Sequence, residues 1–279
     1  MSMGAQDVAD VLRRERGVDI SSYDAGYVRK TVEKRMLALG CEDVQEYSCV
    51  LRSSGDEISA LLRQLVNTWS EFFRDPLAFA YLENIVLPLL RDGLRLRQPG
   101  AIRAWSAGCS TGQEAWSLAI LLEELCSERD ERVPYQLFAT DSSQQVLVQA
   151  RNGVYDLAVA GDVRLRHLKR YLLREGQQLR VAPALFSNVS FEQHDLLDVQ
   201  SHCPPSCVYG DFDIILCCNL LMYYRGDIRQ YILEKLSRCL STGGYLMVGS
   251  AEREIVLSSG YYTTVCPYIP VFQPIHERI

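Results

Sequence analysis

A loop of small residues and two acidic side chains are the first group that could do chemistry. The loop, Ala107–Gly112, follows an apolar stretch and precedes Glu114, and Asp141 ends a second apolar stretch. A glycine-rich turn lets backbone N–H groups approach a ligand closely, and an acid at a strand tip can accept both hydroxyls of a ribose. Because the G-x-G-x-x-G spacing that cradles a pyrophosphate is missing, the pattern favours S-adenosylmethionine over a dinucleotide. Helix capping is the alternative role for both acids.

Two further groups of polar residues stand near the expected ends of elements. Asn219 and Tyr223 follow a later apolar stretch, where an amide and a phenol would face the same crevice. Arg74 lies at the join between two halves of the chain, and a guanidinium there could hold a carboxylate through two hydrogen bonds. The alternatives are rim packing for Tyr223 and a helix-start ion pair for Arg74.

An alternation of strands and helices must position these residues. We expect strands at 101–106, 135–141, 188–194, 212–217 and 244–249, and helices at 114–126, 142–151 and 226–239. This order predicts a parallel sheet with helices on both faces. Residues 152–187 interrupt it with a basic helix at 164–174 and extended pieces at 178–181, so we expect an insertion there. Residues 261–272 should add an antiparallel edge pair.

The first hundred residues have helical patterns only. The expected helices are 7–16, 25–39, 43–51, 56–65 and 76–90, the last with Asp75 as N-cap and Pro76 in its first turn. Within 25–39 lies a basic stripe with a local net charge of +3, made by Arg29, Lys30, Lys34 and Arg35 against Glu33. A solvated helix face and a surface for an acidic protein partner explain this stripe equally well.

Composition narrows the class of protein. The chain has 279 residues and a net charge of −6, which argues against a general nucleic-acid binder. The N-terminal residues lack the pattern of a signal peptide and no apolar run is long enough to span a bilayer, so we expect a cytoplasmic protein. The ten cysteines contain no C-x-x-C pair and are expected to be reduced, and a metal site at Cys203 and Cys207 has weak support.

Several motifs, taken in order, resemble those of the chemotaxis receptor methyltransferases, the CheR family. The resemblance covers nearly the whole chain. The matching segments are Gly17–Ile20, Tyr27–Met36, Ser70–Asp75, Trp105–Glu114, Ala139–Asp141 and Phe212–Ile215, followed by Asn219 and Tyr223. The chain departs from the family pattern at Cys218, where the family usually has arginine.

The resemblance implies an α/β fold. A Rossmann-like class I S-adenosylmethionine methyltransferase domain with a small β-subdomain insertion would follow an all-α N-terminal domain. We expect a helical, receptor-facing domain at 1–75, a linking helix at 76–98 and the methyltransferase domain at 99–279, with its insertion at 152–187. In the family this inserted subdomain can dock a receptor tail peptide.

The resemblance also implies roles by position. Arg74 and Tyr223 match the residues nearest the transferred methyl group and are the expected catalytic pair. The expected cofactor-lining residues are Thr68, Ser70, Arg74, Gly108, Glu114, Asp141, Asp195, Leu196, Cys218 and Asn219. The basic stripe is the expected receptor-binding surface, and no metal is expected.

The implied activity is methyl transfer from S-adenosylmethionine to glutamate side chains of chemoreceptors, giving a methyl ester and S-adenosylhomocysteine. Such a glutamate is already ionised at neutral pH, so no general base is needed. The expected partner is the cytoplasmic domain of methyl-accepting receptors, with no nucleic acid, no membrane insertion and a monomeric state. Two alternatives stay open: a non-catalytic module of the same fold, suggested by Cys218, and a nucleotide-dependent oxidoreductase, which the missing glycine motif disfavours.

Overall fold

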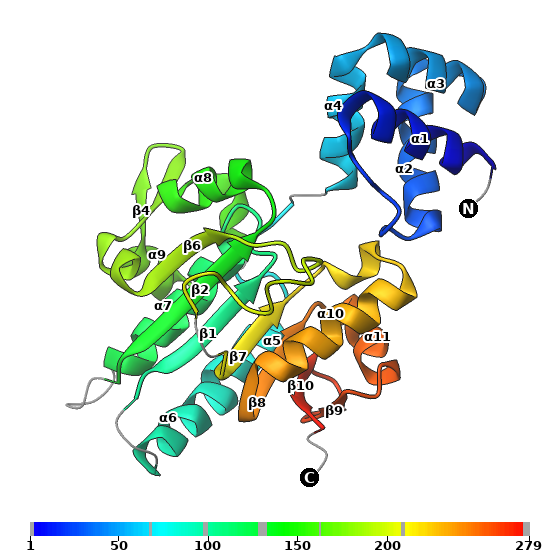
Figure 1. The fold of residues 1–279 in the computed structure, drawn as a ribbon. Helices are drawn as coiled ribbons and strands as arrows, with labels where there is room; N and C mark the ends of the chain where they lie inside the picture. Colours follow the sequence, from blue (N-terminus) through cyan, green and yellow to red (C-terminus); the bar gives the residue numbers. More distant parts are fainter. Residues whose placement is uncertain are drawn as a thin grey trace. The chain divides into compact units, whose positions relative to one another are not determined.

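The computed structural model describes residues 3–66, 69–96, 100–127, 133–161, 163–207 and 210–275. The chain forms two compact units, both drawn in Figure 1. The helical unit comprises Met1–Thr68 and Met222–Gln230, and the sheet unit comprises Trp69–Leu221 and Tyr231–Ile279. The boundary therefore falls earlier than residue 75, and the expected linking helix belongs to the sheet unit.

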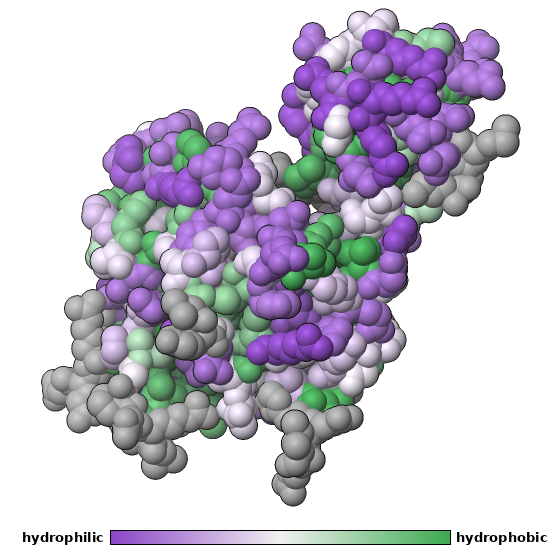
Figure 2. All heavy atoms as spheres, in the orientation of Figure 1, coloured by the Kyte–Doolittle hydropathy of each residue, from purple (hydrophilic) through white to green (hydrophobic). Residues whose placement is uncertain are grey.

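The helical unit is built from α1 (Met3–Arg16), α2 (Ala25–Leu39), α3 (Val44–Ser53) and α4 (Gly55–Leu65), close to the expected ranges. Asp24, Asp43 and Ser54 cap α2, α3 and α4 by accepting hydrogen bonds from backbone N–H groups of the first turn. Gly40 ends α2 in the left-handed conformation, with φ 71°. The apolar faces of the helices meet in one core, which includes Val8, Leu12, Val32, Tyr47, Leu51 and Leu61. The visible face of this unit is mostly hydrophilic (Figure 2).

The sheet unit contains a seven-stranded sheet in the order β6-β2-β1-β7-β8-β10-β9. Its strands are β1 (Ile102–Ala107), β2 (Tyr135–Asp141), β6 (Val189–Gln193), β7 (Phe212–Cys217), β8 (Leu240–Val248), β9 (Tyr262–Thr264) and β10 (Val271–Pro274). The pairs from β6 to β8 are parallel, and β9 and β10 form the expected antiparallel edge. Every residue of β7 is buried, which is typical of a parallel strand covered on both faces.

The helices of this unit are α7 (Gln113–Ser127), α8 (Gln144–Asn152), α10 (Gly226–Cys239), of which Tyr231 onward belongs here, and α11 (Arg253–Ser258). One strand boundary differs from expectation, because β8 begins at Leu240 instead of residue 244. Phe212 pairs with Leu240 whereas Ile214 pairs with Tyr245, so extra β8 residues bulge out of the ladder. The 3-10 turns η4 (Leu221–Tyr223) and η5 (Ser250–Glu252) follow β7 and β8.

The insertion expected at 152–187 folds as a small antiparallel sheet in the order β3-β5-β4. Its elements are β3 (Val154–Asp156), η2 (Leu157–Ala160), α9 (Leu165–Tyr171), β4 (Leu172–Glu175), β5 (Gln178–Val181) and η3 (Pro183–Asn188). The basic helix expected at 164–174 begins one residue too early and ends three residues too late. Residues 172–175 pair with β5 instead, across a tight turn in which Gly176 has φ 64°.

The helix expected at 76–90 is correct at its start. Asp75 accepts a hydrogen bond from the Ala78 N–H, and Pro76 begins α5 (Pro76–Tyr81). The continuation differs, because a π-helical turn, η1 (Leu82–Val86), precedes α6 (Leu87–Leu96). Such turns often lie at functional sites.

Candidate functional site

The carboxyl ends of the parallel strands bring the loops after β1, β2, β6 and β7 to one edge of the sheet, where open α/β sheets bind ligands. The N–H groups of Gly108 and Cys109 both donate to the Thr140 carbonyl at 2.8 Å, which ties the glycine loop to the end of β2. The His194 N–H donates to the Asp141 carbonyl at 3.1 Å, which ties β6 to the same place. Backbone hydrogen bonds therefore hold the loops after β1, β2 and β6 together at this edge.

Two glycines of the loop are required by close packing. Gly108 has φ 79°, and a Cβ there would lie 2.9 Å from Cδ1 of Leu220. Gly112 has φ 97°, and a Cβ there would lie 2.8 Å from the Ala150 side chain. L-residues with side chains rarely adopt these angles, so any substitution would shift the loop.

Asp141 lies half-buried at the tip of β2, as expected. Its two carboxylate oxygens accept hydrogen bonds from the N–H groups of Ser110, at 3.0 Å, and Ser143, at 2.9 Å. Burial raises the pKa of Asp141, those backbone donors oppose the rise, and the charge of Asp195 adds to it. A carboxylate can accept about four hydrogen bonds, so Asp141 keeps acceptor capacity for ligand hydroxyls.

Glu114 and Cys218 lie together beside the loop. The Ser106 hydroxyl donates to Glu114 Oε1 at 2.6 Å, and the Cys218 thiol forms a hydrogen bond with the same carboxyl group. Burial raises the pKa of Glu114 to about 7, against the opposing effect of these two hydrogen bonds. Burial also raises the pKa of the Cys218 thiol. The position that usually carries arginine in the resembling family therefore holds a neutral thiol here.

The raised pKa of Glu114 predicts how stability changes with pH. Folding takes up a proton here between pH 4.5 and about 7, so this group stabilises the fold at low pH and loses that contribution as pH rises through 7. Between pH 5.5 and pH 8, the unfolding free energy of wild type should therefore fall by about 2 kcal/mol more than that of Glu114→Gln. Urea unfolding at the two pH values measures it. An equal pH slope in both proteins would contradict the assignment.

Asn219 follows β7 in the left-handed conformation, with φ 57°. Its N–H donates to Oε2 of Glu252 at 2.7 Å, and the Gly249 N–H donates to the same oxygen at 3.0 Å. Glu252 is fully buried and therefore fixes the backbone of both loops. The sequence analysis did not assign Glu252 to the site, although an acid soon after the strand expected at 244–249 was a usable signal.

Asp195 and Leu196 follow β6. The carboxylate of Asp195 accepts a hydrogen bond from the Leu197 N–H at 2.9 Å, and its charge acts on Asp141. Leu196 is buried, and its carbonyl accepts a hydrogen bond from Lys235 Nζ at 3.0 Å. The structure thus brings Gly108, Glu114, Asp141, Asp195, Cys218 and Asn219 to one edge, with Leu196 adjoining them.

The junction segment, residues 69–75, is held against this edge by its aromatic residues. The ring of Phe72 packs edge-on against Tyr155 at 5.1 Å, and the Tyr155 hydroxyl donates to the Thr111 carbonyl of the glycine loop at 2.7 Å. The Phe73 N–H donates to Ser117 Oγ on α7 at 2.9 Å. Tyr155 is a second residue that the sequence analysis missed, and it has no local sequence signal.

Arg74 and Ser70 are both half-buried in the junction segment. The Arg74 guanidinium donates a long hydrogen bond, 3.4 Å, to the Trp69 carbonyl. This bond is longer than a typical N–H···O hydrogen bond, so it restrains the side chain only weakly. At the end of the segment, the Ser250 hydroxyl donates to Asp75, which joins η5 to the start of α5. Thr68 lies outside the described residues.

Two sequence families match the chain. Residues 4–66 match the family described as "CheR methyltransferase, all-alpha domain", and residues 68–263 match "CheR methyltransferase, SAM binding domain". The chain belongs to the CheR methyltransferase family. The matched ranges meet near the boundary between the helical unit and the sheet unit.

Named relatives of this CheR chain are chemotaxis enzymes. It is 33% identical over 265 residues to the chemotaxis protein methyltransferase Cher2 of Pseudomonas putida, covering 91% of this chain and 92% of that protein. It is 29% identical over 252 residues to the chemotaxis protein methyltransferase of Salmonella typhimurium, covering 88% and 82%. A third relative, an uncharacterized 104.1 kDa protein of Rhodobacter capsulatus, is 30% identical over 88% of this chain, which spans only 25% of that longer protein.

The CheR family implies S-adenosylmethionine as cofactor, and the crevice residues fit it. Gly108 gives the loop a backbone conformation that residues with side chains rarely adopt, and Asp141 offers a carboxylate for ribose hydroxyls. Glu114 has a pKa near 7 and no ion-pair partner within the described residues. Its carboxylate is therefore available to a cationic ligand. No cluster of three metal-ligating side chains occurs in the described residues, and none of their helices has the length and apolarity of a membrane span.

Tyr223 of this CheR chain belongs to the helical unit. Its ring lies 4.7 Å from that of Tyr27, and its carbonyl accepts a hydrogen bond from the Asp24 N–H at 2.8 Å. Burial raises the pKa of Tyr27 to about 12, with Tyr223 adding to the rise. Aromatic packing, the alternative that the sequence left open for Tyr223, is therefore present.

The basic stripe needs one correction. Arg35 forms a two-pronged ion pair with the buried Glu57, with Nε to Oε1 at 2.8 Å, and the Tyr47 hydroxyl donates to the same carboxylate. Arg35 therefore stabilises the helical unit and is not free to bind a partner. Sequence spacing missed this pair because Glu57 comes from α4. Arg29, Lys30 and Lys34 are exposed, and Arg29 lies 3.8 Å from Glu33.

Proposed function

We propose that this CheR-family chain transfers the methyl group of S-adenosylmethionine to glutamate side chains of chemoreceptors. The products are a glutamate methyl ester and S-adenosylhomocysteine. The observation that carries the proposal is the meeting of Gly108, Glu114, Asp141 and Asn219 at one sheet edge, without a pyrophosphate cradle. The names of the relatives support methyl transfer in chemotaxis, and the family resemblance supplies the receptor as substrate class.

The cofactor-lining residues are proposed to be Ser70, Arg74, Gly108, Glu114, Asp141, Asp195, Leu196, Cys218 and Asn219, together with Thr68. When bound, S-adenosylmethionine supplies an electrophilic methyl group on a sulfonium. The chain has to align the attacking carboxylate and exclude water from it, and orientation of this kind contributes roughly 7–11 kcal/mol. We assign Arg74 to holding the glutamate carboxylate and Tyr223 to orienting it through the phenol hydroxyl.

The helical unit is proposed to face the receptor, and we expect the protein to act as a monomer in the cytoplasm. The alternative, a non-catalytic module of the same fold, was suggested by Cys218. This thiol is neutral and forms a hydrogen bond with Glu114 at the sheet edge, so it adds no charge there. A direct test compares ligands in a thermal melt. S-adenosylhomocysteine should raise the melting temperature and NAD should not, whereas stabilisation by NAD alone would favour an oxidoreductase.

Recognition of the receptor through the exposed part of the basic stripe gives a further prediction. Reversing Lys30 and Lys34 to Glu should raise the KM for receptor and flatten its salt dependence, because surface charges act over about 8–10 Å and mainly set encounter rates. The affinity for S-adenosylhomocysteine should stay unchanged. Initial rates at several salt concentrations measure the effect.

The matched control reverses Arg52 and Arg63, two exposed cations elsewhere on the helical unit. It changes the net charge equally and should leave the KM close to wild type. If the Lys30 and Lys34 variant methylates receptor as well as wild type at low salt, the stripe is a solvated face. Recognition would then lie in the 152–187 insertion.

A further inference from the structure

The backbone on either side of Arg74 is strained. Phe73 has φ 52° and Asp75 has φ 69°, both in the left-handed region that residues with side chains rarely adopt. Such angles persist only where surrounding contacts hold them, and they gather at functional sites. The contacts that hold Phe73 therefore decide where Arg74 lies.

The Phe73 side chain is packed between two rings. It is 6% exposed, and its ring stacks on His167 of α9 at 5.3 Å with 21° between the planes. Phe79 of α5 packs edge-on against it, also at 5.3 Å. His167 is 1% exposed, so the stack is closed to solvent. His167, a residue of the inserted subdomain, thus packs against one face of Phe73, the residue before Arg74.

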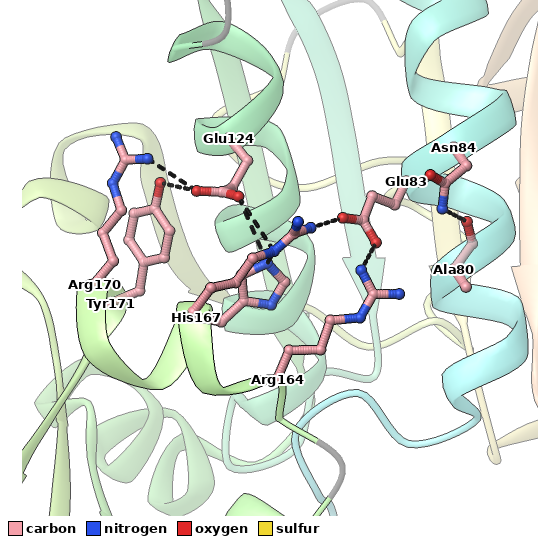
Figure 3. Close-up of polar contacts among 9 residues, drawn as sticks. Ala80, Glu83, Asn84, Glu124, Arg164, His167, Arg170 and Tyr171 are labelled. Atoms are coloured by element: carbon pink, nitrogen blue, oxygen red, sulfur yellow. Dashed lines mark hydrogen bonds and ion pairs between the residues drawn. The ribbon is translucent and has the colours of Figure 1, made fainter.

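Charged side chains fasten α9, and with it His167, onto the rest of the sheet unit (Figure 3). Glu83 of η1 accepts hydrogen bonds from Arg164 and Arg166. Glu124 of α7 accepts from Arg170 and from the Tyr171 hydroxyl, both at 3.0 Å. The two carboxylates are less than one-fifth exposed, so solvent weakens these ion pairs less than it weakens pairs on the surface.

The His167 ring itself is suited to stacking. Arg166 Nε donates to its Nε2 at 3.1 Å, while Glu124 Oε2 lies 3.7 Å from that nitrogen. Burial, followed by the charge of Arg166, lowers the pKa of His167, with Arg164 acting the same way and Glu124 and Glu83 opposing. The ring is therefore uncharged near neutral pH. The cavity beside it holds about 40 Å³, room for a few waters and too little for a substrate.

We propose that His167 is a positioning residue for methyl transfer, which acts through Phe73 to fix the backbone of Arg74. This inference rests on the proposed role of Arg74. The inserted subdomain would thus contribute to the reaction through packing. Its helix α9 carries the His167 ring, and the hydrogen bonds and ion pairs of Glu83 and Glu124 set the position of α9.

A double-mutant cycle tests the inference. His167→Ala should lower kcat for receptor methylation about tenfold, because small displacements of an orienting group are costly. His167→Phe, which keeps a flat ring, should restore kcat to within about twofold of wild type. In an Arg74→Ala background, His167→Ala should cause no further loss, since its effect would pass through Arg74. Should His167→Ala not fold, His167→Leu replaces it with the same expectations.

A purely structural role predicts different results. Leu185→Ala, a cavity variant at a fully buried position of the sheet unit, serves as the control and should keep kcat near wild type at a similar loss of melting temperature. Wild-type kcat in His167→Ala, or an equal loss with and without Arg74, would overturn the inference. Full activity of Arg74→Ala alone would instead refute the proposed role of Arg74, and the inference with it, so the two failures are distinguishable.

Discussion

Arg74→Ala is expected to lower kcat for receptor methylation by about 100-fold, equivalent to about 3 kcal/mol of transition-state stabilisation. The guanidinium is the one orienting cation that the junction segment offers within the described residues, and a two-pronged hydrogen bond to a carboxylate fixes both distance and plane. The melting temperature should change little, because within the described part of the chain Arg74 makes only a long hydrogen bond to Trp69. Initial rates with labelled cofactor measure kcat.

Arg74→Lys is the matched variant. Lysine keeps the charge but lacks the planar fork, so we expect its kcat to lie between those of alanine and arginine. Some loss of cofactor affinity is compatible with the account, since Arg74 is also proposed to line the cofactor. Full methylation activity in the alanine variant would remove Arg74 from the reaction.

Asp141→Ala is expected to weaken binding of S-adenosylhomocysteine by about 2–3 kcal/mol, or roughly 30- to 150-fold in Kd. The variant loses charge-assisted hydrogen bonds to the ribose, and it also frees the N–H groups of Ser110 and Ser143 that shape the loop. Asp141→Asn keeps one acceptor oxygen and should fall between alanine and wild type. Isothermal titration calorimetry gives the three affinities.

Asp92→Ala controls for the loss of one negative charge, because Asp92 is an exposed acid on α6 of the same unit. Its affinity for S-adenosylhomocysteine should equal that of wild type. An unchanged Kd in Asp141→Ala would show that the ribose is bound elsewhere.

Local sequence features predicted most of the fold. Asp75 and Pro76 predicted the start of α5 because a cap and a fixed φ act within one turn. The mostly apolar stretch at 212–217 predicted β7 to the residue, since parallel strands covered on both faces are near-continuous hydrophobic runs. The extended piece expected at 178–181 is β5 to the residue, but its partner β4 was missed, although the glycine at 176 was a local signal for a turn between two strands.

Contacts between distant parts of the chain could not be predicted. Arg35 lay in a basic run, and only the packing of α2 against α4 shows that Glu57 neutralises it. The acids at strand ends, Asp141 among them, were found because parallel strands place their carboxyl ends together. His167 was missed because its role arises from packing against Phe73, which the sequence does not place nearby. Glu252 was missed although it follows the end of β8, the same kind of position that revealed Asp141.

The central claim is most directly tested by the fate of the methyl group. Purified chain is incubated with membranes holding the host's chemoreceptors and S-adenosylmethionine labelled in the methyl group, and the modified receptor residue is identified by mass spectrometry. We predict label on receptor glutamates as a base-labile ester, formed by wild type and formed about 100-fold more slowly by Arg74→Ala. Unlabelled receptors, or label on another type of side chain, would contradict the assignment of this chain as a receptor glutamate methyltransferase.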